Sequence, residues 1–526
     1  MRFLALVLLA NPCYAQVPAL GRVVFPTSGP PGAQQRFVRG VLLLHSFEYL
    51  DAREEFRAAR MLAPGFAMAA WGEAMTYNEP IWFARDDAAA RSALIALAPT
   101  PAARAAKAPT PREQDYLQAV DILFGDGTGE RRDAAYAEAM RRLHEKYPED
   151  NEAAVFYALA LLGTCHSGRD PRVYMQAAAV LEDILLRNRE HPGAMHYLIH
   201  CYDDPIHAPL GLRSAKVYGK VAADAPHALH MPSHIFFALG LWDDAAASNL
   251  QAWQASVRKS ERQRTAIESG GYHALWWLEY AHLQQGRYQD ARRILQSMDS
   301  IASRNPTPLN RFHVLMMRAA FAVDTGEPYT AGSQIDDLEV SAQAAHLLAT
   351  GLSMSQQGLR LEADRALSQL KALSHASPKA GPGEQGLTHL HPSDARVIEI
   401  MEHELTAVLL LSDGNSRQAI ERISQAAALE DRTPFEFGPP LPVKPAHELF
   451  GEILLQLGQP AAARRRFETA LLRTPRRALS LLGLARALDQ GGEPNLGHAA
   501  YLELRQTWRN ADGALLQAID ARLKNP

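Results

Sequence analysis

The chain has 526 residues, of which 47% are hydrophobic and 21% charged, a composition that is typical of a globular protein and excludes a disordered or collagen-like chain. At one domain per ~150 residues, the length allows three or four blocks that each bury a core. Lys and Arg number 54 against 58 Asp and Glu, and the net charge of −4 is too balanced for the basic surface that nucleic-acid binding needs. We therefore expect no nucleic-acid partner.

The N-terminus has the pattern of a secretory signal peptide over residues 1–15. A basic residue precedes an apolar run from Phe3 to Ala10, and small residues stand at Cys13 and Ala15 before a cleavage point. We expect the protein to be periplasmic or secreted, with residues 16–33 as an extended N-terminal segment. No other apolar run approaches the ~18 residues of a transmembrane helix, so we expect no transmembrane segment.

Removal of the signal peptide would leave two cysteines, Cys165 and Cys201. An exported protein can join two thiols in a disulfide, but the sequence does not place the two Cα atoms within bonding reach. Two buried free thiols are the favoured interpretation, and the disulfide stays open.

A glycine followed five positions later by an alanine recurs along the chain. The pairs are Gly240 with Ala245, Gly286 with Ala291, Gly326 with Ala331, Gly414 with Ala419, and Gly458 with Ala463. Two stretches carry a longer pattern, at the spacing of a helix, a tight turn, a second helix and a stop. They are Gly40, Ala52, Phe56, Ala59 and Pro64, and Gly451, Ala463, Phe467, Ala470 and Pro475. Nothing in the sequence indicates alternating strands.

These residues resemble the tetratricopeptide repeat, in which small residues let antiparallel helices approach closely and a proline closes the second helix. The resemblance implies an all-α superhelix of helical hairpins. Pro and Gly residues break the helical periodicity at 372–395, so we expect a linker or a long functional loop there, between two helical segments at residues 34–371 and 396–526. From Gly458 to Gly492 the step has the family's own length, but the steps in the middle of the chain are longer. The resemblance also implies a protein or peptide partner on the concave face of the superhelix.

Histidine is concentrated in one window of the chain. Seven of the 20 histidines fall between residues 191 and 234: His191, His196, His200, His207, His227, His230 and His234. Apolar neighbours such as Tyr197 and Ile235 predict that the helices carrying them are buried. For His191 and His207, both close to prolines, we favour loop roles over metal ligation.

The spacing of the remaining five histidines favours metal binding. His196 and His200 are four apart in a predicted helix, so both imidazoles project from one face. Asp203 and Asp204 follow, where a carboxylate either binds the ion or orients a histidine. His230 and His234 repeat the spacing, with Pro232 expected to open the helix and leave His227 and His230 in the preceding turn. His273 is expected on an adjoining helix.

These considerations define one set of candidate metal ligands, with no catalytic residue assigned. The set is His196, His200, Asp203, Asp204, His227, His230, His234 and His273. Imidazole ligands without thiolates favour zinc, copper or iron over magnesium or calcium, and the number of imidazoles allows a dinuclear site. Tyr197 and Leu198 occupy the positions between His196 and His200, so the His-Glu-x-x-His of zinc proteases is missing.

The same window also resembles a group of bacterial exported tetratricopeptide-repeat proteins. The similar motifs are His196-Tyr-Leu-Ile-His200 with Asp203-Asp204-Pro205, and Ala228-Leu-His230-Met-Pro-Ser-His234. This resemblance implies the repeat fold and export, but no substrate.

Two hypotheses from different classes follow from the sequence. The first is a repeat protein with a transition-metal site in its central helices, acting as a metal-dependent enzyme if a coordination position is open. The alternative is a repeat scaffold for a protein or peptide partner, in which the histidines are structural.

Overall fold

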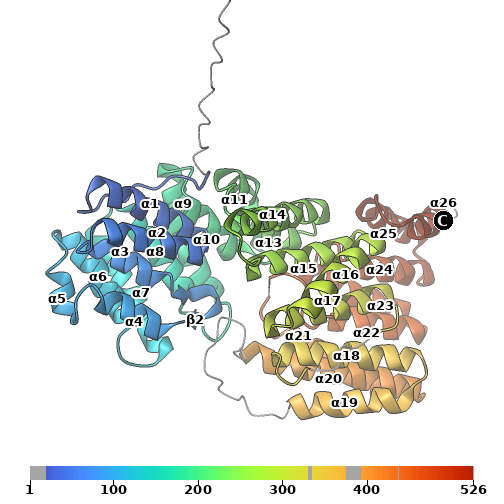
Figure 1. The fold of residues 1–526 in the computed structure, drawn as a ribbon. Coiled ribbons are helices and arrows are strands. Elements are labelled where there is room, and N and C mark those ends of the chain that lie inside the picture. The colour runs from blue at the N-terminus through green and yellow to red at the C-terminus, as the bar shows by residue number, and fades with distance from the viewer. Residues whose placement is uncertain (1–18, 330–334, 375–391, 436, 525–526) are drawn as a thin grey trace, which may run out of the picture.

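The computed structural model describes residues 19–329, 335–374, 392–435 and 437–524, which form an almost entirely α-helical array (Figure 1). The all-α prediction is confirmed. The predicted signal peptide at 1–15 and most of the predicted linker, residues 375–391, lie outside the described residues. No described helix is long and apolar enough to cross a membrane.

The N-terminal part of the array contains ten helices and one two-stranded antiparallel ribbon, in which Asn78 pairs with Arg85 and Glu79 with Ala84. The elements are α1 (Pro31–His45), α2 (Tyr49–Leu62), α3 (Ala67–Met75), β1 (Asn78–Glu79), the 3₁₀ turn η1 (Pro80–Trp82), β2 (Ala84–Arg85), α4 (Asp87–Ile95), α5 (Pro101–Ala105), α6 (Pro111–Leu123), α7 (Gly129–Lys146), α8 (Asn151–Leu162), α9 (Pro171–Arg187) and α10 (Pro192–Tyr202).

The array continues through the middle of the chain to its C-terminal end. The middle helices are α11 (Ala208–Val221), α12 (Pro226–His230), α13 (Pro232–Ala238), α14 (Trp242–Gln263), α15 (Ser269–Gln284), α16 (Tyr288–Arg304), α17 (Pro308–Thr325), α18 (Val340–Gln356) and α19 (Arg360–Ser374). The C-terminal helices are α20 (Pro392–Ser412), α21 (Ser416–Glu430), α22 (Ala446–Gln456), α23 (Pro460–Arg473), α24 (Ala478–Gln490), α25 (Pro494–Thr507) and α26 (Gly513–Lys524).

Successive helices pack as hairpins, and the recurring glycines lie in the turns between them. All five have the left-handed backbone conformation, which ends a helix at low cost only when the residue has no Cβ. They are Gly240, Gly286, Gly326, Gly414 and Gly458. Four of the five alanines paired with them are buried on the helix that follows, and Ala331 lies outside the described residues.

The repeat pattern predicted from the sequence also explains how the paired helices pack. A Cβ atom added at Gly451 would lie 2.7 Å from the ring of Phe467, which is fully buried. The same relationship joins Gly40 and Phe56 in the first hairpin. These contacts, which only glycine allows, define a tetratricopeptide-like superhelix.

The buried hydrophobic residues form several clusters that follow one another along the array. One cluster of buried residues extends from Leu20 to Phe321, and a second extends from Leu315 to Val443. The second cluster combines residues before and after the predicted linker, such as Leu348 and Leu405. Helices on both sides of that linker therefore share one core, and α18 and α20 lie side by side (Figure 1).

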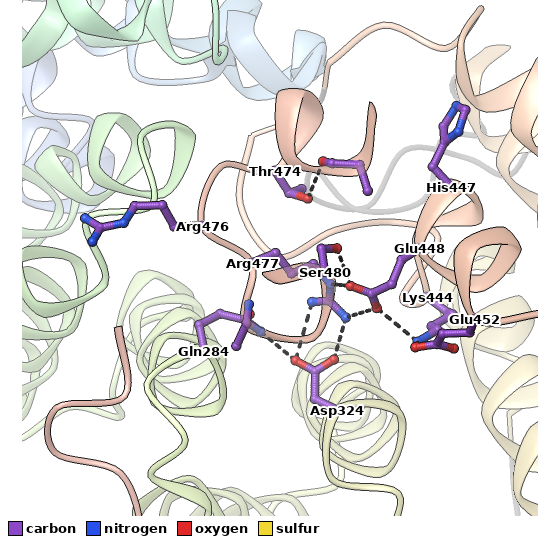
Figure 2. A network of polar contacts seen from close by, with 12 residues as sticks. Gln284, Asp324, Lys444, His447, Glu448, Glu452, Thr474, Arg476, Arg477 and Ser480 are labelled. Carbon is purple, nitrogen blue, oxygen red and sulfur yellow. Dashed lines mark hydrogen bonds and ion pairs between the residues drawn. The ribbon is translucent and has the colours of Figure 1, made fainter. Parts of the chain in front are cut away.

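A buried network of charged residues joins the middle helices to the C-terminal ones (Figure 2). Arg477, just before α24, pairs with Asp324 of α17 at 2.6 Å and with Glu448 of α22 at 2.8 Å. Lys444 contacts the same Glu448 at 3.0 Å, and Gln284 of α15 donates to Asp324. These buried, paired charges connect α15 and α17 with α22 and with the residue before α24.

One contact outside the sequential hairpins positions the candidate site. Helix α1 packs against α10, which is nine helices further along the chain. The turn from His45 to Glu48, between α1 and α2, is thereby placed against the helices that carry the histidine cluster.

Candidate metal centre

Six of the predicted ligand histidines meet at the centre of the molecule. They come from α10 (His196 and His200), α12 (His227 and His230), α13 (His234) and α15 (His273). Every residue of α10 is buried, so its two histidines are core residues rather than part of a surface. The structure corrects one detail, because His227 and His230 lie in the short helix α12 rather than in a turn.

The first group consists of His196, His200 and His227. One nitrogen of each ring lies within 4.8 Å of one nitrogen of the other two, and this set could hold a metal ion. The ring centres of His200 and His227 are each 5.0 Å from that of His196. Small side-chain rotations would bring these nitrogens to the metal–nitrogen distance of ~2.1 Å.

The second group consists of His230, His234 and His273, which meet the same 4.8 Å criterion. The two groups are neighbours: the ring centres of His200 and His234 are 5.3 Å apart, and those of His227 and His230 are 5.9 Å apart. The structure therefore brings together two adjacent sets of three imidazoles.

Hydrogen bonds on the outer side of three rings fix which nitrogen carries the proton. Nδ1 of His196 lies 2.6 Å from the carbonyl oxygen of His45, and Nδ1 of His230 lies 2.6 Å from Oδ1 of Asn249. Nδ1 of His234 lies 3.0 Å from Oδ2 of Asp203. Each of these oxygens only accepts, so Nδ1 is the protonated nitrogen and Nε2 keeps its lone pair.

The amide orientation of Asn249 is itself fixed by a second contact. Its Nδ2 donates to the carbonyl oxygen of Ala245 at 2.9 Å, which leaves Oδ1 toward His230. The tautomer of His230 therefore follows from the hydrogen-bond network.

The Nε2 atoms of His230 and His234 face each other at 3.2 Å. Because both rings hold their proton on Nδ1, two lone pairs point at one another in the buried centre. Nε2 of His196, of His200 and of His227 is buried without a hydrogen-bond partner among the described residues, whereas Nδ1 of His200 lies 3.4 Å from Oδ2 of Asp203. Buried acceptors without donors are costly, and a cation placed between them removes that cost.

Burial keeps five of the imidazoles neutral, those of His196, His227, His230, His234 and His273. It lowers the pKa of His196, His227, His230 and His273 well below the ordinary value, and the neighbouring histidines add to the effect. Burial lowers the pKa of His234 to about 4 in spite of the hydrogen bond to Asp203. A neutral imidazole is the form that binds a metal ion.

Asp203 supports the centre from the outside. Burial opposes its ionisation, but Arg169 and the neighbouring imidazoles of His200 and His234 hold its pKa below the usual range. Its Oδ1 lies 2.5 Å from the guanidinium of Arg169, while Oδ2 faces His234. Together with His200 and His234 it forms another group with suitable donor spacing. Its existing contacts favour the orienting role.

The structure places Asp204, the other predicted carboxylate ligand, outside all the donor groups found among the described residues. Its carboxylate is 3.0 Å from Arg169 and 2.7 Å from Nδ1 of His207, and it accepts the backbone N–H groups of Ile206 and His207. Asp204 therefore shapes the turn before α11, and its lone pairs are already used.

Aromatic rings enclose the two groups. The ring centre of Phe47 lies 4.3 Å from that of His196, and Trp277 lies 4.6 Å from His234. Phe437 covers His234 at 4.8 Å. Phe47 has a φ of 54°, a left-handed conformation that costs energy in a residue with a side chain. The turn that contains Phe47 therefore holds its aromatic ring against the imidazole of His196.

Three residues that the sequence did not assign to the metal site lie directly behind the first group. His45, Glu152 and His191 are fully buried and form a further set with suitable donor spacing. The sequence favours a loop role for His191, and in the structure His191 precedes α10 and caps it by accepting the backbone N–H of Ala194. His45 and Glu152 are isolated in the sequence, so no local pattern pointed to them.

The two cysteines are free and buried. Burial raises the pKa of Cys201 and of Cys165, so both thiols are protonated. The favoured interpretation of two free thiols agrees with this structure.

Comparison with known proteins finds similar solved structures at low sequence identity. No family model matches the chain, and no curated protein matches it. Yeast Tom70 is 11% identical over 94% of this chain and 96% of its own, with a TM-score of 0.28. The anaphase-promoting complex hetero-tetramer Cut9–Hcn1 is 14% identical over 94% and 96%, with a TM-score of 0.29. The Naa15/Naa10 structure bound to HypK-THB is 13% identical over 94% and 70%, with a TM-score of 0.24. With scores this low, nothing about the histidines is carried over from these proteins.

Proposed function

We propose that this chain is a metalloprotein whose central helices bind two transition-metal ions, one in each group of three histidines. The observation that carries the proposal is the contact between the Nε2 atoms of His230 and His234, at 3.2 Å. Both Nδ1 atoms donate to oxygen acceptors, so neither Nε2 carries a proton. An ion bound to these lone pairs turns a repulsive contact into coordination.

The ligand chemistry narrows the metal to zinc, copper or iron. Imidazole suits these ions, and no thiolate is part of either group. Three imidazoles per ion leave a fourth coordination position free, as in catalytic rather than structural sites. We therefore favour a metal-dependent enzyme, with the aromatic enclosure excluding bulk water from the open positions.

Metal analysis of the purified protein tests the proposal directly. The protein is prepared without chelator, loaded with Zn²⁺ or Cu²⁺ and desalted, and metal is measured by mass spectrometry. We expect about two ions per chain, because six imidazoles divide into two three-histidine sets. The double variant His196→Ala, His200→Ala should retain about one ion, as should His230→Ala, His234→Ala.

A matched control removes two histidines that lie outside the centre. His282 contacts Gln285 and His346 contacts Tyr329, both at normal hydrogen-bond distances. The variant His282→Ala, His346→Ala should retain both ions. A parent protein without stoichiometric metal, or equal loss in the control, would overturn the proposal.

The alternative function is a scaffold for a protein or peptide partner, as expected for an array of helical hairpins with extended surfaces. It predicts that the histidines serve packing only. Under that alternative, removing His196 and His200 reduces the stability of the protein, and the affinity for the partner does not depend on metal.

A further inference from the structure

Glu152 of α8 lies at the centre of a fully buried network behind the first histidine group. Its Oε2 is 2.7 Å from Nε2 of His45, and its Oε1 is 3.0 Å from Nε2 of His191. All three residues have no exposed surface. The carboxylate accepts from both rings, so each ring carries a proton on Nε2.

The other nitrogen of each ring is also satisfied. Nδ1 of His45 accepts from the hydroxyl of Tyr197 at 3.0 Å, and Nδ1 of His191 accepts from the backbone N–H of Ala194 at 3.3 Å. None of the four ring nitrogens keeps a free lone pair. This set has the donor spacing of a metal site, but unlike the two histidine groups it needs no cation to satisfy its polar atoms.

The network holds two parts of the metal centre at once. The carbonyl oxygen of His45 accepts the Nδ1 proton of His196, and His191 caps the helix that carries His196 and His200. Helix α10 approaches His45 so closely that a Cβ at Gly193 would lie 2.4 Å from its ring. Among the described residues, Glu152 is the one that is hydrogen-bonded to both the ring of His45 and the ring of the cap residue His191.

We propose that Glu152 is a positioning residue of the metal centre, which aligns His45 and α10 so that Nε2 of His196 faces the ion. His45, Glu152 and His191 are then supporting residues and not a third metal site. This inference rests on the proposed function, since it assigns a role toward the ions bound by the six histidines.

The test compares Co²⁺ binding by the parent protein and by Glu152→Gln. The amide nitrogen of glutamine places a donor against one Nε2–H group, so the network cannot keep both contacts. We expect Co²⁺ affinity, measured by chelator competition, to fall about 10- to 100-fold, with a changed visible spectrum of bound Co²⁺. The number of ions bound at saturation should stay the same.

Glu448→Gln is the matched control, because Glu448 is equally buried and paired on both sides, but lies in the network that docks the C-terminal helices. This variant should lose stability and keep the parent's Co²⁺ affinity and spectrum. A second variant, Tyr197→Phe, removes only the hydrogen bond to His45 and should weaken Co²⁺ binding in the same direction by less. If Glu152→Gln does not fold, the Co²⁺ affinity of Tyr197→Phe tests the positioning role instead.

Three outcomes separate the two proposals. A parent protein that binds no Co²⁺ would contradict the metal centre itself. Parent-like affinity and spectrum in Glu152→Gln would overturn the positioning role while leaving the centre intact. Loss of one ion from a total of three would show that Glu152 is a ligand, and would also overturn it.

Discussion

Nδ1 of His196 lies 2.6 Å from the main-chain oxygen of His45, a residue 151 positions earlier in the chain. This hydrogen bond fixes the tautomer of His196 and directs its Nε2 away from the first hairpin. The carbonyl is available because His45 is the last residue of α1, where helix carbonyl groups lack intrahelical partners. The C-terminal end of α1, near the start of the chain, thus orients the proposed ligand His196 of α10.

Asn249 should matter to metal binding although it is not a ligand. Replacing it with alanine removes the acceptor that holds the Nδ1 proton of His230. We expect Zn²⁺ affinity to fall about 10- to 100-fold in Asn249→Ala, measured by competition with a chelator. Ser256→Ala, which removes another buried polar group from α14, should keep the parent's affinity. Unchanged affinity in Asn249→Ala would show that the contact is structural only.

At Phe47, a glycine substitution should give a more stable protein than an alanine substitution, the reverse of the usual order. Both Phe47→Ala and Phe47→Gly lose the ring that covers His196, but only glycine relieves the left-handed backbone. We expect the free energy of unfolding of the glycine variant to exceed that of the alanine variant by about 1 kcal/mol. Urea denaturation measures the difference, and an alanine variant at least as stable as the glycine one would contradict the strain.

Glu279 of α15 should make stability depend on pH. Both of its carboxyl oxygens are buried without a partner among the described residues, and burial, with Asp324 nearby, raises its pKa well above 4.5. The folded state therefore holds a proton that the unfolded state releases above pH 4.5. The free energy of unfolding is therefore unaffected by this group below pH 4.5, and it falls as the pH rises from 4.5 toward the pKa of Glu279 in the folded protein.

The variant Glu279→Gln removes this dependence while keeping the size of the side chain. Its stability relative to the parent should increase by about 1.4 kcal/mol per pH unit above the unfolded pKa, up to the folded pKa. Urea denaturation at pH 5, 6 and 7 measures it. Glu54→Gln, at an exposed position of α2, should show no such trend. A constant difference across this range would show that Glu279 is ionised in the folded protein.

Arg477 should be needed for docking of the C-terminal helices. Arg477→Ala leaves Asp324 and Glu448 facing each other in the interior without their shared cation (Figure 2). We expect a loss of about 3–5 kcal/mol in the free energy of unfolding, with faster proteolysis of α22–α26. Arg464→Ala, which breaks exposed ion pairs with Glu468 and Glu493, should cost under about 1 kcal/mol. Similar losses in both variants would rule out a special role for the buried network.

Much of the fold and part of the site followed from local patterns. The spacing of Gly451 and Phe467 predicted a close helix pair, because that contact lies within one hairpin. The four-residue spacing of His196 and His200 predicted a shared face, because helix geometry alone determines it. Asp204 was predicted as a ligand because it follows His200 closely in the sequence. The sequence does not show that Arg169 and His207 already contact its carboxylate oxygens.

The sequence by itself determined the helical hairpins, their glycine turns and the concentration of histidines on α10, α12 and α13, because each depends on residues a few positions apart. Only the tertiary structure decided which nitrogens face inward. That choice depends on His45, Asn249 and Asp203, whose contacts with the histidine rings come from packing between helices. Hydrogen bonds between distant segments set the tautomers, and no periodicity in the sequence encodes them.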